Sequence, residues 1–249
     1  LVIHSATKYI DGQGRVLGGA VCGPKRLTEE VFKYLRTAGP TLSAFNAWVL
    51  LKGLETLAVR VDYSNSSAHR IAEFLEAHPA VRWVRYPFLP SHPQHDLAKR
   101  QMSGGGTVVT FELAAPEGAA KQRAFEVLDK LSLIDISNNL GDAKSLITHP
   151  ATTTHRAMGP EGRAAIGLGD GVVRVSVGLE GTDDLIADLD RVRAGQPPTG
   201  EPPAAGASTM IRLRDRSMLE AARRQGPRVK IKVKDHSGKV AKVSAAADP

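Results

Sequence analysis

Cysteine, aromatic residues and long apolar runs are all scarce in this sequence of 249 residues. The single cysteine, Cys22, excludes an intramolecular disulfide and a cysteine-rich metal site, and it fits a reducing cytoplasm. The best apolar run covers residues 47–51 and stops at Lys52, far short of the roughly 18 residues that a membrane helix needs. We therefore expect a cytoplasmic globular protein without a membrane partner, as its 42% of hydrophobic and 24% of charged residues also indicate.

Excess positive charge is confined to the end of the chain. Residues 191–249 hold 13 Lys and Arg against 5 Asp and Glu, whereas residues 1–190 hold 20 against 21. The stretch 196–208 is rich in proline, glycine and alanine, so residues 191–249 are expected to form a disordered basic tail. Charge alone lets such a tail attract nucleic acid or anionic lipid. Since it contains no aromatic residue for stacking on bases, no specific nucleic-acid partner is predicted.

The chain opens on Leu1 and enters a short apolar run at once. No charged segment or cleavage pattern accompanies this run, which excludes a secretory signal as its explanation. A start inside an apparent strand suggests that preceding sequence is missing.

Helical and strand patterns alternate along residues 1–190, which indicates a layered α/β fold. Helices are expected over 28–35, 42–61, 68–78, a short stretch ending near 102, 119–131 and 182–191. Strands are expected over 20–22, 81–86, 107–113, 133–136, 145–148 and 172–177. In the longest of these helices, apolar residues recur every three or four positions, as on one face of a single helix.

The segment His-Ser-Ala-Thr-Lys-Tyr at residues 4–9 carries the sharpest chemical signal. A lysine amine such as that of Lys8 can form an imine with an aldehyde and can also carry a proton. Ser5 and Thr7 alternate along an extended segment, so both hydroxyls can donate to one phosphate. Pyridoxal phosphate requires both features, a lysine for its aldehyde and an anchor for its phosphate. The alternative is a surface lysine beside ordinary turn hydroxyls.

Two further places suggest a carboxylate site. Arg174 lies in an otherwise apolar strand, where a guanidinium is costly without a partner. Its planar fork suits a substrate carboxylate. Taken alone, however, an edge strand with Arg174 facing water is the slightly better explanation. The turn-rich stretch 138–146 can aim amides and the Asn139 side chain at the same carboxylate, or it can be plain turn chemistry.

Four histidines raise the question of a zinc site, which their spacing rejects. No cysteine or glutamate supports them, and their loop positions suit solvated side chains, so no metal is predicted. They are His92, His95, His149 and His155.

Five segments in order carry a resemblance to a known family: residues 4–9, 52–57, 91–95, 153–155 and 174–180. Together they resemble the C-terminal part of the cystathionine γ-synthase/γ-lyase family of pyridoxal-phosphate enzymes, over residues 1 to about 190. The resemblance implies an α/β fold of the fold-type I PLP-dependent transferases. In that fold, residues 1–61 are a remnant of the large cofactor-binding domain. Residues 62–190 are a smaller C-terminal α/β domain with a mainly antiparallel sheet, and residues 191–249 are the tail.

The same resemblance assigns roles to individual residues. Lys8 is the lysine that binds pyridoxal 5'-phosphate and acts as the catalytic base, while Ser5 and Thr7 hold the cofactor phosphate. Asn139 and Arg174 bind the substrate.

Residues 139–144 and 151–155 resemble the sulfhydrylase branch of the family. Segments 11–19 and 35–41 look most like enzymes that use O-succinylhomoserine. The implied reaction, in methionine biosynthesis, is γ-replacement of succinate by sulfide to give homocysteine, in an intact enzyme that is a cytoplasmic homotetramer. Cystathionine γ-synthase, γ-lyase or O-acetylhomoserine sulfhydrylase chemistry stays open. So does a non-enzymatic fragment with an anion-binding tail. Because the family's preceding half is absent, we expect this chain alone to bind the cofactor weakly or not at all and to be inactive.

Overall fold

The computed structural model describes residues 1–191, 230–234 and 240–244. Contacts divide the chain into two compact units, Leu1–Pro202 and Pro203–Pro249. In the second unit, β8 (Lys230–Lys234) and β9 (Val240–Ser244) form an antiparallel pair, with Lys230 opposite Ser244. The expected linker at 196–208 lies outside the described residues, as does most of the expected tail.

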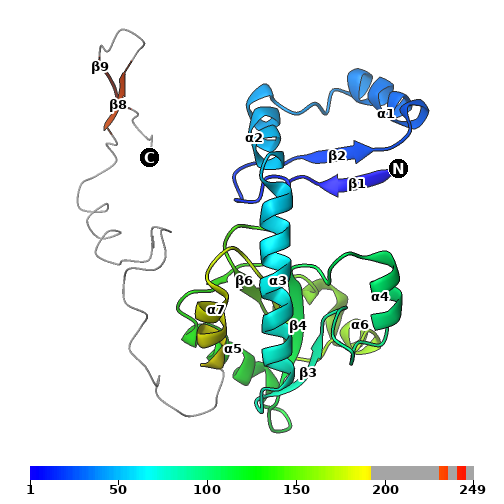
Figure 1. Cartoon of the computed structure of the whole chain (residues 1–249), viewed down its shortest axis with the longest axis vertical. Helices are drawn as coiled ribbons and strands as arrows, with labels where there is room; N and C mark the ends of the chain where they lie inside the picture. Colours follow the sequence, from blue (N-terminus) through cyan, green and yellow to red (C-terminus); the bar gives the residue numbers. More distant parts are fainter. Residues whose placement is uncertain (192–229, 235–239, 245–249) are drawn as a thin grey trace. The chain divides into compact units, whose positions relative to one another are not determined.

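The first unit is organised around a five-stranded sheet, of which β3, β4 and β6 are labelled in Figure 1. The strand order is β3-β4-β7-β6-β5. Neighbouring strands are antiparallel except β5 and β6, which are parallel, so the expected mainly antiparallel sheet is confirmed. The strands are β3 (Val81–Arg85), β4 (Val108–Leu113), β5 (Asp135–Ile136), β6 (Leu146–Thr148) and β7 (Val172–Ser176).

Helices α3 (Leu57–Glu76), α5 (Ala120–Lys130) and α7 (Thr182–Asp190) pack with this sheet around one core. The apolar face predicted within 68–78 is confirmed. Four residues at positions i, i+3, i+4 and i+7 of one face of α3 are fully buried against the strands: Ala68, Ile71, Ala72 and Leu75. Phe111 of β4 and Val173 of β7 lie at the centre of the same core. Burial of these side chains supplies the main driving force for folding this part.

The prediction of one continuous helix over 42–61 is wrong. The chain forms α2 (Ala44–Leu54), breaks at Glu55 and Thr56, and continues as α3. The apolar spacing runs through the break because no proline marks it. The predicted inner face is also only partly buried: Val49 and Leu50 are covered, whereas Phe45 is 66% exposed.

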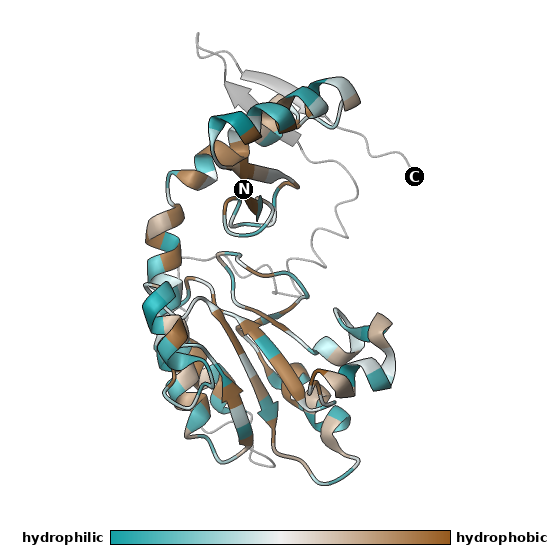
Figure 2. Cartoon of the chain, turned by 90° about the vertical axis from the view of Figure 1, so that its right-hand side faces the viewer, coloured by the Kyte–Doolittle hydropathy of each residue, from teal (hydrophilic) through white to brown (hydrophobic). Residues whose placement is uncertain are grey.

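Before α2, β1 (Val2–Ser5) and β2 (Gly19–Cys22) form a separate antiparallel pair, followed by α1 (Lys25–Ala38). Figure 2 shows the hydrophobic colouring of β1 beside the N-terminus. This part has only a small core of its own, made by Ala6, Val16, Val49 and Leu50 with Ile10 against them. No residue of α1 is buried.

Between the strands lie shorter elements, of which only α4 was expected. They are α4 (His95–Gln101), η1 (Pro150–Thr152), η2 (Arg156–Met158) and α6 (Gly159–Ala165). Within the part of the chain that the structure describes, no helix is long and apolar enough to cross a membrane.

Candidate active site

Lys8 lies on a compact turn that directly follows β1. The amide of Lys8 donates to Ser5 O at 3.1 Å, Asp11 N to Ala6 O at 2.8 Å, and Gly12 N back to Lys8 O at 2.8 Å. These bonds fold residues 5–12 into a closed loop, which we call the lysine loop. It fixes the backbone of Lys8, whose side chain is half-buried.

The amine of Lys8 donates a hydrogen bond to Asn139 Oδ1, from a residue 131 positions further along the chain. The structure thus brings together two of the residues that the sequence had proposed for one site. The contact places a flexible ammonium against a fixed acceptor on the turn between β5 and β6.

Arg174 lies in the middle of the sheet, since β7 pairs with β4 on one edge and with β6 on the other. The edge-strand interpretation is therefore wrong. Its Nη2 donates to the carbonyl oxygens of Asn138 at 2.9 Å and Asn139 at 3.3 Å. Among the described residues its buried Nε has no hydrogen-bond partner. Burial lowers the pKa of Arg174, against an opposing effect of Tyr9.

The turn at 138–145 contributes carbonyls, where amides had been expected, and these orient Arg174. Hydrogen bonds to Glu180 and Ser176 hold this turn in place. Ser145 donates through N and Oγ to the buried Glu180 carboxylate at 2.7 and 2.8 Å, and Gly141 N donates to Ser176 Oγ at 3.0 Å. Gly141 has φ of 74°, and a Cβ there would lie 2.9 Å from Tyr9 N, so only glycine lets the turn approach the lysine loop so closely. The sequence analysis did not predict a role for Glu180. A carboxylate that closely follows the apolar strand β7 does suggest a buried, hydrogen-bonded side chain.

The two proposed phosphate residues lie apart from this contact. The Thr7 hydroxyl accepts from Gly18 N at 3.1 Å and donates to Gly18 O at 3.4 Å, so it joins the loop to the approach to β2. Ser5 is exposed at the end of β1. No hydrogen bond found among the described residues joins Ser5 or Thr7 to Asn139 or Arg174.

One of the four histidines is not a solvated loop residue. His149 is buried, with Nδ1 2.9 Å from Thr152 Oγ1, Nε2 2.7 Å from Asp170 O and its ring edge-on to Phe125. It is a satisfied core residue. In the described ranges no group of three potential ligands lies close enough to hold a metal ion.

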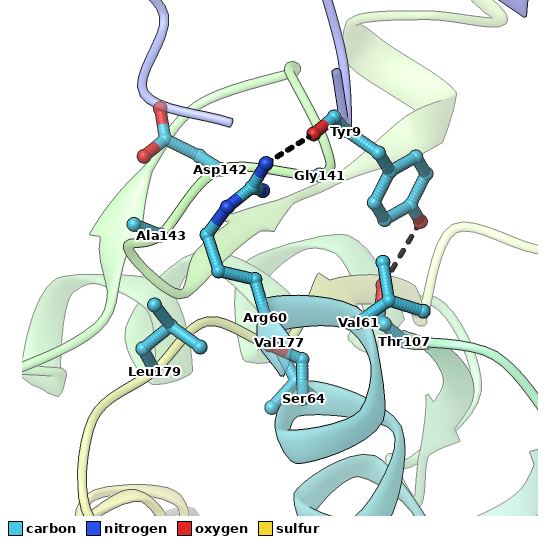
Figure 3. Close-up of a pocket in the computed structure, with 10 residues that line it drawn as sticks. All are labelled: Tyr9, Arg60, Val61, Ser64, Thr107, Gly141, Asp142, Ala143, Val177 and Leu179. Carbon is cyan, nitrogen blue, oxygen red and sulfur yellow. Dashed lines mark hydrogen bonds between the residues drawn. The ribbon is translucent and has the colours of Figure 1, made fainter. Parts of the chain in front are cut away.

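A narrow cavity lies behind the lysine loop, lined by Tyr9, Arg60 and Gly141 among others (Figure 3). Its volume of about 10 Å³ accommodates at most about one water molecule, so it is a packed junction and no substrate site. Tyr9 closes one side, with its hydroxyl 2.9 Å from Thr107 Oγ1.

Comparison with known proteins defines the class. The family model described as Cys/Met metabolism PLP-dependent enzyme matches residues 1–192, and the chain belongs to this family. Its enzymes depend on pyridoxal phosphate, so the expected family and cofactor are both confirmed.

Individual relatives show which members of the family this chain is most similar to among those compared. An O-succinylhomoserine sulfhydrylase of Mycobacterium tuberculosis is 78% identical over 192 residues, which are 77% of this chain and 47% of the relative. The enzyme of the same description from Pseudomonas aeruginosa is 53% identical over 191 residues, 77% of this chain and 46% of that protein. The chain therefore spans about half the length of the curated relatives that it matches.

A crystal structure of cystathionine gamma lyase from Micromonospora echinospora supports the fold. It superposes with a TM-score of 0.72 at 38% identity, covering 78% of this chain and 50% of that one. The expected fold-type I architecture is confirmed by this likeness.

Proposed function

We propose that this chain supplies the lysine-bearing part of a pyridoxal-phosphate enzyme that replaces succinate by sulfide at Cγ of O-succinylhomoserine, giving homocysteine. The observation that carries the proposal is the contact of Lys8 with Asn139, on the turn that also holds Arg174. The 78% identity to an O-succinylhomoserine sulfhydrylase supports the choice of substrate.

The side chains present fit the cofactor. Lys8 offers an amine for the aldehyde, and Ser5 offers an exposed hydroxyl for the phosphate. Thr7 must release Gly18 O to donate to that phosphate, while its bond from Gly18 N persists. When bound, the pyridoxal ring withdraws electrons from the substrate Cα and so makes its proton acidic.

Arg174 is the proposed anchor of the substrate carboxylate. Its Nη2 is held by two carbonyls, so the plane of the guanidinium is fixed before the substrate arrives. Its buried Nε, without a hydrogen-bond partner among the described residues, is a further donor for that carboxylate. A planar fork also orients the carboxylate, which a lysine at this position would not do.

Lys8 is the proposed base. As a neutral amine it takes the proton from Cα, and the resulting ammonium donates to Asn139 Oδ1, which keeps it beside the substrate. A second deprotonation, at Cβ, lets succinate leave from Cγ. Sulfide then adds at Cγ, a proton returns to Cβ, and Lys8 returns the proton to Cα.

Cystathionine γ-synthase, γ-lyase and O-acetylhomoserine sulfhydrylase activities are the competing chemistries. The relatives' names include both synthase and lyase activities at about 40% identity, well below that of the sulfhydrylases. An assay that offers sulfide against cysteine, and succinyl against acetyl ester, separates them.

The experiment joins residues 1–192 to the part of the Mycobacterium tuberculosis relative that this chain does not match. We expect cofactor absorbance and sulfide-dependent release of homocysteine, both lost in Lys8→Ala. Lys130→Ala, a change of the same kind at an exposed position at the end of α5, is the control and retains both. Borohydride trapping of the cofactor on any lysine other than Lys8 contradicts the proposal.

The intact enzyme is proposed to be a cytoplasmic homo-oligomer acting on a small amino-acid substrate. Exposed apolar side chains on α1 and α2, such as Phe32 and Trp48, supply surface for such association. The 249-residue chain alone is expected to bind the cofactor weakly, which absorbance of the purified chain tests directly.

A further inference from the structure

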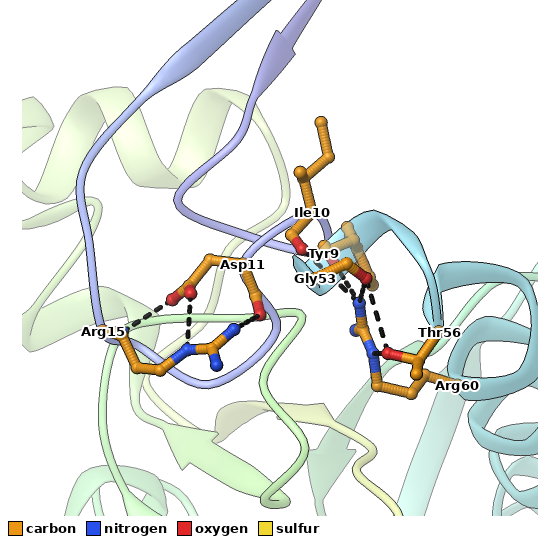
Figure 4. Close-up of polar contacts among 7 residues, drawn as sticks. All are labelled: Tyr9, Ile10, Asp11, Arg15, Gly53, Thr56 and Arg60. Carbon is orange, nitrogen blue, oxygen red and sulfur yellow. Dashed lines mark hydrogen bonds and ion pairs between the residues drawn. The ribbon is translucent and has the colours of Figure 1, made fainter. Parts of the chain in front are cut away.

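Arg60, one turn into α3, is the side chain that joins this helix to the lysine loop (Figure 4). Its Nη2 donates to Tyr9 O at 2.9 Å and lies 3.5 Å from Ile10 O, so it reaches the two residues that follow Lys8. The same nitrogen donates to Gly53 O at 2.8 Å, and Nε donates to Thr56 Oγ1 at 3.1 Å. One guanidinium therefore bridges the lysine loop and the break between α2 and α3.

Two glycines leave the room that this arrangement needs. A Cβ on Gly53 would lie 2.0 Å from Ile10 O, which is backbone and has no freedom to move aside. A Cβ on Gly12 would lie 2.2 Å from Arg60 Nη1, at a position whose φ of 68° already favours glycine. The chain is thus locally built to let Arg60 and the helix break approach the lysine loop.

The positive charge of Arg60 strengthens its hydrogen bonds to the surrounding oxygen atoms. Burial lowers its pKa, Arg15 lowers it further, and Asp11 and Asp142 oppose this, yet a guanidinium stays protonated near neutral pH. All four of its hydrogen bonds described above go to carbonyl or hydroxyl oxygens. Hydrogen bonds from a charged donor are about twice as strong as neutral ones, so this group is a firm tie between the two segments.

The lysine loop is also tied to the turn that carries Asn139. Ala143 N donates to Gly12 O at 2.7 Å, at the far end of the loop from Lys8. Arg60 therefore acts on the middle of the loop, while Ala143 holds its end. Movement of Tyr9 O or Ile10 O would carry Lys8 away from Asn139.

We propose that Arg60 is a positioning residue that holds Lys8 against Asn139. The proposal depends on the proposed function only for the importance of Lys8, because the contact itself is a property of this chain. It predicts that loosening Arg60 frees the Lys8 amine without touching the amine itself.

The test measures the reactivity of the Lys8 amine in the full 249-residue chain, without cofactor. Limiting formaldehyde and borohydride methylate lysines, and peptide mass spectrometry gives the rate at Lys8 relative to the exposed Lys25. Arg60→Met is expected to raise this ratio about tenfold, the size of one lost charged hydrogen bond in an opening equilibrium. Arg60→Lys keeps the charge without the fork, and we expect it to restore part of the protection.

Arg70→Met is the matched control, because Arg70 lies on the same helix and pairs with Asp183, away from the lysine loop. We expect it to leave the Lys8 ratio unchanged. Should Arg60→Met fail to fold, Thr56→Val removes the acceptor of Nε together with the weak 3.4 Å bond from the hydroxyl to Gly53 O, and should give a smaller rise. A folded Arg60→Met with lowered resistance to urea and an unchanged Lys8 ratio overturns the proposal. Since no cofactor is used, failure of the proposed function does not affect the result.

Discussion

Residues 1–56 and residues 57–191 differ sharply in how much of their apolar surface they bury. We call them the lysine region and the sheet region. The sheet region has a continuous core that runs from α3 through the strands to α7. The lysine region has a core of four residues, while Ile3, Phe32 and Trp48 stand exposed. The sheet region therefore buries its apolar side chains within this chain, whereas the lysine region leaves several large ones exposed, which supports the association proposed above.

The two regions also contribute differently to the proposed site. Lys8 comes from the lysine region, but Asn139, Arg174 and Arg60 all come from the sheet region. The weakly packed region is therefore held, at the lysine loop, by side chains of the well-packed one.

The largest effect is expected in the core of the sheet region. Phe111→Ala removes a fully buried ring from β4 and should lower the free energy of unfolding by about 3–5 kcal/mol. The same change at Phe45, which is 66% exposed in α2, should cost less than about 0.5 kcal/mol. Urea unfolding of both variants makes the measurement. Similar losses at the two positions would abolish the distinction between the regions.

A second effect is expected beneath the turn that carries Asn139. Glu180→Gln replaces a buried carboxylate that accepts two hydrogen bonds from Ser145, and should cost about 1–3 kcal/mol in unfolding free energy. Glu117→Gln, at an exposed position, serves as the matched change and should be nearly neutral. If both variants unfold at the same urea concentration as the parent, Glu180 does not support the turn.

A third effect concerns surface and leaves stability almost unchanged. Trp48→Glu should reduce both self-association in sedimentation and binding of a hydrophobic dye, since Trp48 is 56% exposed on α2. Ile136→Glu, which changes an exposed apolar residue of the sheet region, should alter neither. Equal loss of dye binding in the two variants would show that the exposed surface is not concentrated in the lysine region.

The smallest effect is a dependence on alkaline pH. Burial raises the pKa of Tyr86 to about 12. The Tyr86 hydroxyl donates a hydrogen bond to Gly106 O at 3.0 Å. A raised pKa in the folded state means that stability is complete below the ordinary value of about 10 and declines as pH rises towards 12. Ultraviolet titration should find one late tyrosine, absent from Tyr86→Phe, and that variant should lose stability less steeply above pH 10. An unchanged titration curve would exclude Tyr86 as the late group.

The sheet region was largely predictable from sequence, because its helices and strands carry clear periodicities. The apolar face of α3 and the strand around Arg174 follow from such patterns. Their order in the sheet does not, since strand neighbours are set by tertiary packing. Sequence alone therefore left open whether Arg174 lay at an edge, and the structure places it in the middle.

The lysine region and the site were less predictable. Lys8 and Asn139 were each identified by residue type, but their contact spans 131 positions and no local signal encodes it. Arg60 was missed because an arginine on a helix is usually a solvent-facing residue. Its role depends on the break at Glu55 and Thr56, which the apolar spacing conceals.

The central place of β7 has a consequence for how related enzymes diverge. The strand is hydrogen-bonded along both edges, so neighbouring strands hold the backbone at Arg174 from both sides. The 138–145 turn, by contrast, is anchored mainly through side chains that substitution can exchange. We therefore expect the backbone that presents Arg174 to persist among related chains, while substitutions accumulate in the turn beside it.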